Sequence, residues 1–214
     1  MLKTTLRAIT PPLIYKALAS LRRLTTDKAE NLFEGDDALF KSIVLKALIY
    51  AEYGCGASTL WVFKHTACEI FSVDSAPDWL KHVEQSCGSS PKIHLHHADV
   101  GPVKEWGIPV GYSHYTNFID YTNWIWEQNI SPDVILIDGR FRVCCFLTSL
   151  LRAKEGAYIF FDDYRDRGEY HIVEQFIRPT QTCGRQTMFL VPSKATLDVA
   201  KLEQFIDHFR LVFD

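Results

Sequence analysis

From Asp36 onward, apolar and polar residues follow two repeating patterns. Short apolar runs predict buried strands, and longer segments with apolar residues three or four positions apart predict helices. The first helix is expected in "DDALFKSIVLKAL", which starts at Asp36. Strands are then expected at 48–53, 69–74, 92–98, 133–138 and 157–162, and helices at 58–65, 77–87, 115–128, 141–153 and 169–178. Two strands near 181–184 and 187–192, a hairpin around Gly184, and a helix from 194 to 210 complete the pattern.

Strands that alternate with helices predict an α/β fold with helices on both faces of a mostly parallel sheet. With the closing hairpin, the sheet has seven strands and the fold is a three-layer, Rossmann-like sandwich. We expect this domain to span residues 36–214. Ligands of such sheets bind at the carboxyl ends of the strands, so the residues that follow each strand are the candidates for function.

Residues 1–35 have a different character and are expected to form an N-terminal helical extension and a connector. Within 13–24, Ile14, Leu18 and Leu21 share one helical face and leave the basic residues off it. Residues 1–28 carry a net charge of +5, which leaves −8 for the rest of the chain. A basic amphipathic segment of this kind can lie on an anionic membrane surface or pack on the domain.

Composition narrows the class of protein. With 214 residues, 47% of them hydrophobic, the chain can bury one sizeable core. The net charge of −3 does not favour a nucleic-acid partner. Six cysteines without a CxxC pair indicate a reduced, intracellular protein. No apolar run reaches membrane-spanning length and no clean signal peptide is present, so we expect a cytoplasmic protein, with peripheral contact at the inner membrane face as an option for residues 1–28.

The first strand runs into a glycine turn, "EYGCGAST", that follows Glu52. Gly54 and Gly56 let a backbone pass close to a ligand, and Ser58 can cap the next helix. A dinucleotide fingerprint would need a small residue where Thr59 stands, and Glu52 would repel a pyrophosphate. The turn therefore disfavours a nicotinamide cofactor and favours a ligand with an ammonium group.

Acidic residues also follow the second and third strands. Asp74 ends the second strand and Asp99 follows the third. With Glu52 these make three carboxylates, and such a set can bind a cation with one acid, the hydroxyls of a diol with another and an exocyclic amine with the third. The alternative is that Asp74 and Asp99 are ordinary turn acids that cap the next helix or loop.

The ordered set Glu52, Gly54, Gly56, Asp74 and Asp99 resembles class I S-adenosylmethionine-dependent methyltransferases over roughly residues 36–195. The resemblance implies S-adenosyl-L-methionine as cofactor, with Asp74 accepting from both ribose hydroxyls and Asp99 near the adenine amine. The cofactor contacts that it implies are Glu52, Gly54, Cys55, Gly56, Ser58, Asp74, Ser75, Asp99, Val100 and Asp138.

A second acidic group follows the fourth and fifth strands, in "IDG" and "FDDY". Asp138, Asp162 and Asp163 are expected to converge, because these strands are neighbours in this architecture. The pattern is similar to metal-assisted O-methyltransferases, including the macrocin O-methyltransferase group, and implies Asp138, Asp162 and Asp163 as ligands of Mg²⁺. Arg140 and Arg142 depart from that group. They can instead neutralise the acids in an ion-pair network, or bind a carboxylate or phosphate of the substrate.

For the reaction itself, the candidate catalytic residues are Asp163, Asp138 and Tyr164. His171 is expected on a helix surface, and His94 and His96 alternate along a strand without a further close ligand for zinc. His97 is placed near the adenine. The aromatic-rich segment 101–128 provides an acceptor wall or a packed helix, with 101–114 as the candidate lid.

Together these features predict methyl transfer from S-adenosylmethionine to a hydroxyl, on a small-molecule or glycan acceptor of polysaccharide biosynthesis. A non-catalytic binding or scaffold protein that retains the fold is the alternative. The sequence does not predict an oligomeric state.

Overall fold

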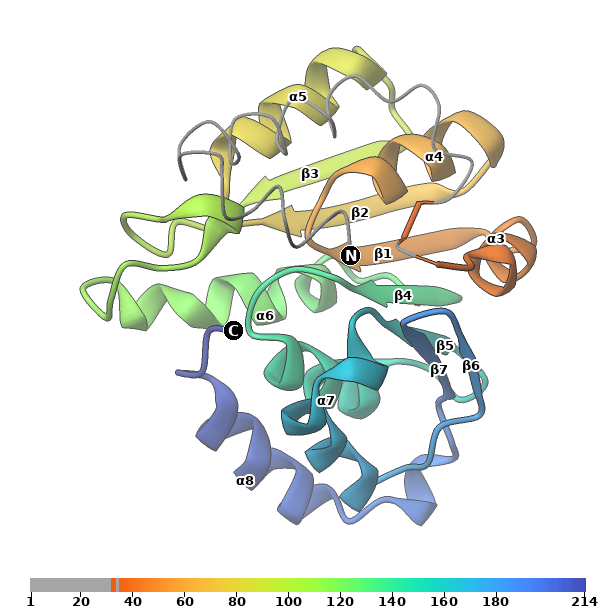
Figure 1. Ribbon diagram of the computed structural model, residues 1–214, viewed down its shortest axis with the longest axis vertical. Helices are drawn as coiled ribbons and strands as arrows, with labels where there is room; N and C mark the ends of the chain where they lie inside the picture. Colours follow the sequence, from red (N-terminus) through yellow and green to blue (C-terminus); the bar gives the residue numbers. More distant parts are fainter. Residues whose placement is uncertain (1–31, 34) are drawn as a thin grey trace, which may run out of the picture. The chain divides into compact units, whose positions relative to one another are not determined.

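The computed structural model describes residues 32–33 and 35–214 (Figure 1). The predicted helix at 13–24 and the membrane contact of residues 1–28 lie outside the described residues and stay predictions. The helices are α3 (Ala38–Val44), α4 (Ala57–His65), α5 (Pro77–Cys87), α6 (Phe118–Glu127), α7 (Arg142–Arg152) and α8 (Val199–Phe209). The strands are β1 (Ile49–Tyr53), β2 (Glu69–Asp74), β3 (Ile93–His97), β4 (Val134–Ile137), β5 (Tyr158–Phe161), β6 (Gln181–Cys183) and β7 (Gln186–Leu190).

The strands form one seven-stranded sheet in the order β3-β2-β1-β4-β5-β7-β6. The first five strands are parallel, and β7 runs antiparallel to β5 and to β6. The predicted α/β sandwich with a mostly parallel seven-stranded sheet is therefore confirmed. Strand order reverses between β1 and β4, and this reversal is the point where open α/β sheets bind their ligands.

Side chains of each strand alternate between two apolar layers. Ala51 and Tyr53 of β1 face a large core built with α6, α7 and α8. Tyr50 of the same strand faces the opposite core, which contains Phe40 of α3 and Val62 of α4. Figure 1 shows α4 and α5 on one side of the sheet and α6, α7 and α8 on the other. Because strands buried on both faces need apolar residues at nearly every position, they appear as continuous apolar runs in the sequence.

Most predicted elements lie within a few residues of their observed bounds, and one differs in kind. The helix expected at 169–178 is the 3₁₀-helix η4 (Gly168–Gln175). Its buried residues Tyr170 and Val173 are three positions apart, which is the period that puts them on one face of a 3₁₀-helix. The helix expected at 115–128 begins with the short 3₁₀-helix η2 (Tyr115–Asn117), and the last helix follows another, η5 (Lys194–Thr196).

The loops at the carboxyl ends of the strands contain unusual backbone conformations. Trp106, Phe141 and Asp163 have positive φ angles of 67°, 53° and 58°, although none of them is glycine. Each such residue costs of order 1–3 kcal/mol, so surrounding contacts must hold it there. Among the described residues, no helix has the length and apolar character that crossing a membrane requires.

Candidate active site

The turns that follow β1 and β4 meet backbone to backbone at the point where strand order reverses. A Cβ on Gly54 would lie 2.7 Å from Cα of Gly139 and 2.9 Å from the carbonyl carbon of Asp138. Gly54 also has a φ of 96°. Gly56 differs, since a Cβ there would meet nothing within 4 Å. Gly54 is therefore a packing requirement, and Gly56 faces open space.

Glu52 lies beneath this turn and has 0% exposure. Its Oε2 accepts hydrogen bonds from Tyr50 and Ser58, each at 2.8 Å, and its Oε1 accepts one from Thr59. Thr59 Oγ1 also accepts from the Gly56 amide at 2.8 Å. Burial raises the pKa of Glu52, and the hydroxyl donors oppose that rise.

This network bears on the predicted cofactor role of Glu52 and Ser58. Their polar atoms satisfy each other, and an ammonium group could reach the carboxylate only if a hydroxyl moved aside. In the structure Glu52 stabilises the turn from below; its contact with a cofactor stays a prediction.

Asp74 supports the same turn from the neighbouring strand. Its Oδ2 accepts from the amide of Cys55 at 2.8 Å and its Oδ1 from the amide of Ala76 at 2.7 Å. Asp74 thus caps its own turn and also joins β2 to the glycine turn. Burial raises its pKa, and the backbone hydrogen bonds and the charge of Arg140 oppose that rise.

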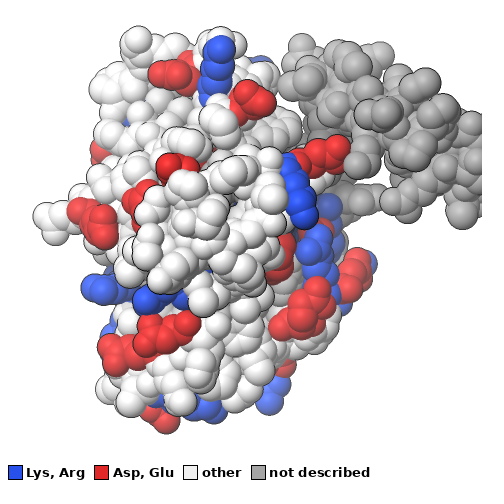
Figure 2. All heavy atoms as spheres, turned by 90° about the vertical axis from the view of Figure 1, so that its left-hand side faces the viewer, with Lys and Arg blue, Asp and Glu red and all other residues white. Residues whose placement is uncertain are grey.

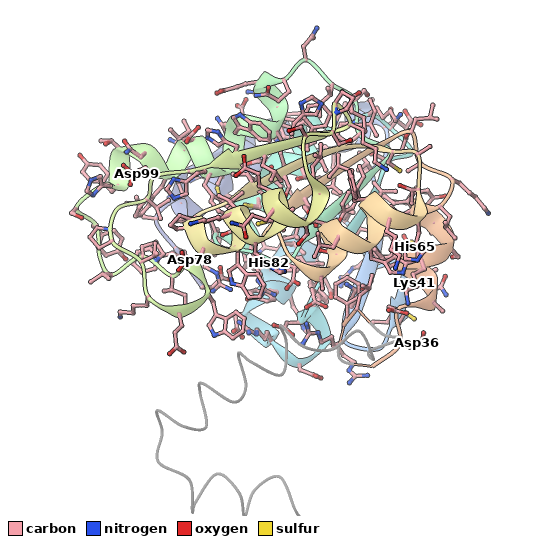
Figure 3. The ribbon with its side chains drawn as sticks, turned by 90° about the horizontal axis from the view of Figure 1, so that it is seen from above. Asp36, Lys41, His65, Asp78, His82 and Asp99 are labelled. Carbon is pink, nitrogen blue, oxygen red and sulfur yellow. The ribbon has the colours of Figure 1, made fainter. Side chains whose placement is uncertain are left out.

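Of the other predicted contacts, Ser75 follows β2, and Asp99 and Val100 follow β3. Ser75 donates from Oγ to the carbonyl of Gly107 at 2.8 Å, which holds the 101–114 segment over the end of β2. Asp99 is exposed and accepts from the amide of Gly101 at 3.0 Å, whereas Val100 is buried. Figure 3 shows Asp99 at the outer end of the domain, on the opposite side from His65.

The acids after β4 and β5 do converge, together with arginines. Asp162 pairs with Arg185 and has 0% exposure. Asp163 contacts Arg167 at 2.9 Å, Arg185 at 3.3 Å and Arg142 at 3.4 Å. Asp138 contacts Arg142 at 3.3 Å. Burial and the nearby charge of Asp138 raise the pKa of Asp162 to about 8, while Arg185 opposes the rise.

This arrangement does not fit the predicted magnesium site at Asp138, Asp162 and Asp163. Every one of these carboxylates is paired with arginine, so a divalent cation would have to displace guanidinium groups. In the described part of the chain, no three His, Cys, Asp or Glu side chains are grouped so as to hold a metal ion. The structure corresponds to the other interpretation of the sequence, an ion-pair network.

Tyr164 is misplaced for the predicted role of catalytic base. It is buried, and its hydroxyl donates to Glu174 at 3.0 Å. Burial and this hydrogen bond raise its pKa, so the phenol keeps its proton. Asp163 is fixed by ion pairs on both oxygens. Asp138, whose side chain is 29% exposed and whose main chain adjoins Gly54, has the best access of the three predicted catalytic residues.

Arg140 and Arg142 are nearly buried beside Asp138 and serve different partners. Arg142 donates to the carbonyls of Gly139 at 2.9 Å and of Asp162 at 3.0 Å, which links the ends of β4 and β5. Arg140 donates from its guanidinium to the main-chain oxygen of Asp214. The amide of Arg142 donates to Oδ1 of Asp214 at 3.0 Å.

The aromatic segment 101–128 has an exposed part and a buried part, so it combines the two predicted roles of acceptor wall and packed helix. Phe118, Tyr121 and Ile125 of α6 are buried in the core, whereas Trp106, Val110, Tyr112 and Tyr115 are exposed. Figure 2 views the molecule from the side where this loop lies, and uncharged atoms cover the middle of that surface. The exposed part can contact an acceptor, and the buried part packs.

The histidines show no catalytic arrangement. His94 stacks on Phe71 and contacts Glu69, and His96 contacts Asp120 and lies parallel to Trp124. His97 is exposed at the end of β3, and His171 contacts the carbonyl of Tyr164.

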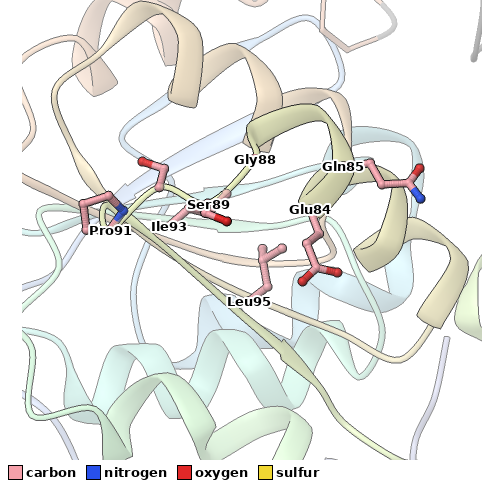
Figure 4. A pocket seen from close by; sticks show the side chains of 8 residues that line it. Glu84, Gln85, Gly88, Ser89, Pro91, Ile93 and Leu95 are labelled. Atoms are coloured by element: carbon pink, nitrogen blue, oxygen red, sulfur yellow. The ribbon is translucent and has the colours of Figure 1, made fainter.

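Two surface pockets lie away from this edge of the sheet. One, of about 640 Å³, lies between the end of α5 and β3 and is lined by residues that include Glu84, Ser89 and Leu95 (Figure 4). The other, of about 260 Å³, adjoins the start of β4 and β5 at Asp133 and Tyr158. Neither contains a residue of the predicted site.

Several residues of the site were missed from the sequence. Arg185 reaches the acids from the β6–β7 hairpin. The Tyr121 hydroxyl accepts from the amide of Arg140 at 3.0 Å and so supports the turn after β4. Nothing near these residues in the chain signals such contacts. Thr59 had a signal, since a hydroxyl three positions after Gly56 is placed to cap the helix start.

Comparison with known proteins agrees with the topology. A methyltransferase-like protein from Silicibacter pomeroyi is similar at 27% identity and a TM-score of 0.73, over 81% of this chain and 92% of that chain. Cofactor-bound Rv0187 from MTB is similar at 15% identity and a TM-score of 0.52, over 89% of this chain and 95% of that one. The sequence matches no protein-family model and no curated protein.

The sheet order, the glycine turn at the strand reversal and these structural relatives agree with the resemblance stated from the sequence. The described domain has the fold of the class I S-adenosylmethionine-dependent methyltransferases.

Proposed function

We propose that this protein transfers a methyl group from S-adenosylmethionine to an acceptor. The observation that carries the proposal is the hydrogen bond between Asp74 and the amide of Cys55, which joins the end of β2 to the glycine turn of β1. It places a buried carboxylate, a glycine facing open space and Asp138 around one point of strand reversal. The similarity to a methyltransferase-like protein supports the same conclusion.

The residues present fit this cofactor. Each oxygen of Asp74 accepts one backbone hydrogen bond and keeps a lone pair, so the carboxylate can accept from both hydroxyls of a ribose. Asp99 and Val100, at the end of β3, are proposed to contact the adenine. The open space beside Gly56 allows a ligand to approach the backbone of the turn.

The finer proposal is that the acceptor group is a hydroxyl of a sugar or another small polar molecule. S-adenosylmethionine would supply an electrophilic methyl group. Asp138 has the exposure needed to accept a hydrogen bond from the acceptor hydroxyl, and Arg142 fixes its orientation at 3.3 Å. The exposed aromatic residues Trp106, Tyr112 and Tyr115 would contact the ring of the acceptor.

Isothermal titration with S-adenosylhomocysteine tests the cofactor assignment. Asp74→Asn should weaken binding by about tenfold or more, because a charge-assisted acceptor is lost. Asp207→Asn, an exposed change on α8, is the matched control and should bind like the wild type. Failure of the folded wild-type protein to bind S-adenosylhomocysteine, or equal loss in both variants, would contradict the assignment.

A second candidate function is non-catalytic binding of the same cofactor. The observation in its favour is that arginines pair with all three acids at the predicted reacting centre. Asp138→Asn separates the two functions in an assay that follows conversion of S-adenosylmethionine to S-adenosylhomocysteine with a panel of sugars and phenols. An enzyme would lose turnover even at saturating S-adenosylmethionine; a wild type inactive on every acceptor would favour the binding protein.

A further inference from the structure

Arg140 is a buried cation with an incomplete set of partners. It is 8% exposed, and its Nε has no hydrogen-bond partner among the described residues. No ion pair joins it to an Asp or Glu side chain in the described part of the chain. Burial and the nearby charge of Arg142 lower its pKa. The charge of Asp214 opposes that fall in pKa, so Asp214 is an acidic partner of Arg140.

Three groups that favour an anion meet around Asp214, and Arg140 supplies one of them. The amide of Arg142 opens α7, an 11-residue helix, and its donor is directed at Oδ1 of Asp214 at 3.0 Å. The Arg140 guanidinium donates to the main-chain oxygen of the same residue. The Tyr170 hydroxyl accepts from Arg167 at 3.0 Å, and burial and the charge of Asp214 raise its pKa, so it keeps its proton and can donate. A carboxylate of the protein itself therefore occupies this position.

Asp214 belongs to a short segment that packs on the site through one aromatic anchor. Phe213 lies 5.0 Å from Tyr112, 5.8 Å from Phe118 and 6.2 Å from Phe141, measured between ring centres. Leu211 and Val212 are exposed. The end of the chain and the loop that follows β3 lie on the same side of the domain in Figure 1. Asp214 is held by Arg140 and by the amide of Arg142, the same groups that a ligand carboxylate would use in its place.

We propose that Arg140, the amide of Arg142 and the hydroxyl of Tyr170 form a carboxylate-binding site, and that Asp214 is its internal occupant, displaced when a ligand carboxylate binds. The inference rests on the proposed function in one respect: the ligand carboxylate is taken to belong either to the methyl donor or to the methyl acceptor. The donor carries a carboxylate in its amino-acid part, and an acidic acceptor would carry its own. Arg142 contacts Asp138 at 3.3 Å, and the charge of Arg140 lowers the pKa of Asp74, so the site is coupled both to the proposed acceptor side and to the proposed cofactor side.

Two ligand pairs distinguish the sources. S-adenosylhomocysteine and 5′-methylthioadenosine share the nucleoside, and only the first has a carboxylate. Benzoate and benzamide form the second pair, used with protein saturated with S-adenosylhomocysteine and with free protein. Affinities are measured by titration calorimetry for the wild type, Asp214→Asn and Arg140→Gln. Asp207→Asn and Arg165→Gln are matched surface controls.

If the donor carboxylate binds here, Asp214→Asn should raise the preference for S-adenosylhomocysteine over 5′-methylthioadenosine by about tenfold, and Arg140→Gln should reduce that preference by about tenfold. If the acceptor carboxylate binds here, that preference should not change, and the preference for benzoate over benzamide should respond in the same two ways.

The proposal is overturned if neither preference responds to Asp214→Asn and Arg140→Gln, or if the control variants respond equally. Phe213→Ala provides a second route should Arg140→Gln fail to fold. It loosens the segment without touching a charged group, and should act in the same direction as Asp214→Asn. Absence of any nucleoside binding by the wild type would refute the proposed function, while the benzoate arm in free protein would still test the carboxylate site.

Discussion

Gly54 and Gly56 occupy the same turn for different physical reasons, and the difference can be measured. Gly54→Ala should destabilise the protein by about 1–3 kcal/mol, because its Cβ would meet the turn after β4 and its φ of 96° is strained for any other residue. Gly56→Ala should leave stability nearly unchanged, since nothing lies within 4 Å of the added atom. Urea unfolding of both variants gives the comparison.

The variants at Gly54 and Gly56 also distinguish an effect on packing from an effect on ligand binding. Gly56→Ala should weaken binding of S-adenosylhomocysteine although the fold is intact, because its Cβ projects into the open space beside the turn. A Gly56→Ala variant with wild-type affinity would show that the ligand does not approach this face of the turn.

Glu52 makes a prediction about pH. Burial raises its pKa above the ordinary glutamate value of 4.5, so the folded state binds the proton more tightly than the unfolded state. Its contribution to stability is therefore complete below about pH 4.5 and is lost as the pH rises through the folded-state pKa. Glu52→Gln should remove this part of the pH dependence when unfolding free energies are measured by urea titration from pH 4.5 upward.

The same substitution has a cost that does not depend on pH. Thr59 receives a hydrogen bond from Gly56 and must donate to position 52, where an amide nitrogen of Gln cannot accept. We expect about 1–3 kcal/mol of destabilisation for the unsatisfied donor. Parallel pH profiles of wild type and variant would contradict the raised pKa.

At the scale of elements, the ion pairs of Arg185 join the β6–β7 hairpin to the end of β5. Arg185→Gln should destabilise the protein by about 3–5 kcal/mol, because Asp162 is fully buried and would lose its counter-charge. Arg165→Gln, at a side chain that is 60% exposed, should change stability by less than about 0.5 kcal/mol. Denaturant titration above about pH 8, where the Asp162 carboxylate is ionised, measures both.

A second variant tests the cause of that loss. Asp162→Asn combined with Arg185→Gln removes the buried charge as well as its partner, and should recover part of the stability lost in Arg185→Gln alone. Equal costs for Arg185→Gln and Arg165→Gln would mean that the ion pair with Asp162 does not stabilise the fold.

The elements themselves were largely predictable. Strands buried on both faces must be apolar along their length, so β1, β2, β4 and β5 could be predicted from local sequence. Segment 168–175 could not, because its 3₁₀ form depends on Tyr170 and Val173 facing a core that local sequence does not describe. In such segments, tertiary contacts override the helix propensity of the local sequence.

At the scale of the whole molecule, ligand binding should be visible as stability. A ligand that binds only the folded state stabilises it by about 2.7 kcal/mol at one hundred times its Kd. S-adenosylhomocysteine should therefore raise the thermal midpoint, and NAD should not. The rise should persist in EDTA, because arginines pair with Asp138, Asp162 and Asp163. A shift that requires Mg²⁺ would restore the metal hypothesis.

The site was predictable to the extent that it follows strand ends. The convergence of Asp138, Asp162 and Asp163 follows from adjacent parallel strands and was predicted. The groups that neutralise these carboxylates include Arg167 and Arg185, which come from separate later segments of the chain. Two alternatives, a metal and an ion-pair network, were both compatible with the sequence, since only the fold brings those arginines to the acids.

The contact between Gly54 and Gly139 limits how this protein can diversify. Neither position tolerates a side chain while the other backbone lies against it, so the turns after β1 and β4 cannot change shape independently. Variation within the turn after β4 has to enter at the positions beside Gly139 and leave that glycine in place. A library that randomises residues 138 and 140–141 and keeps residues 54 and 139 as glycine would therefore retain folded members far more often than one that randomises the whole turn.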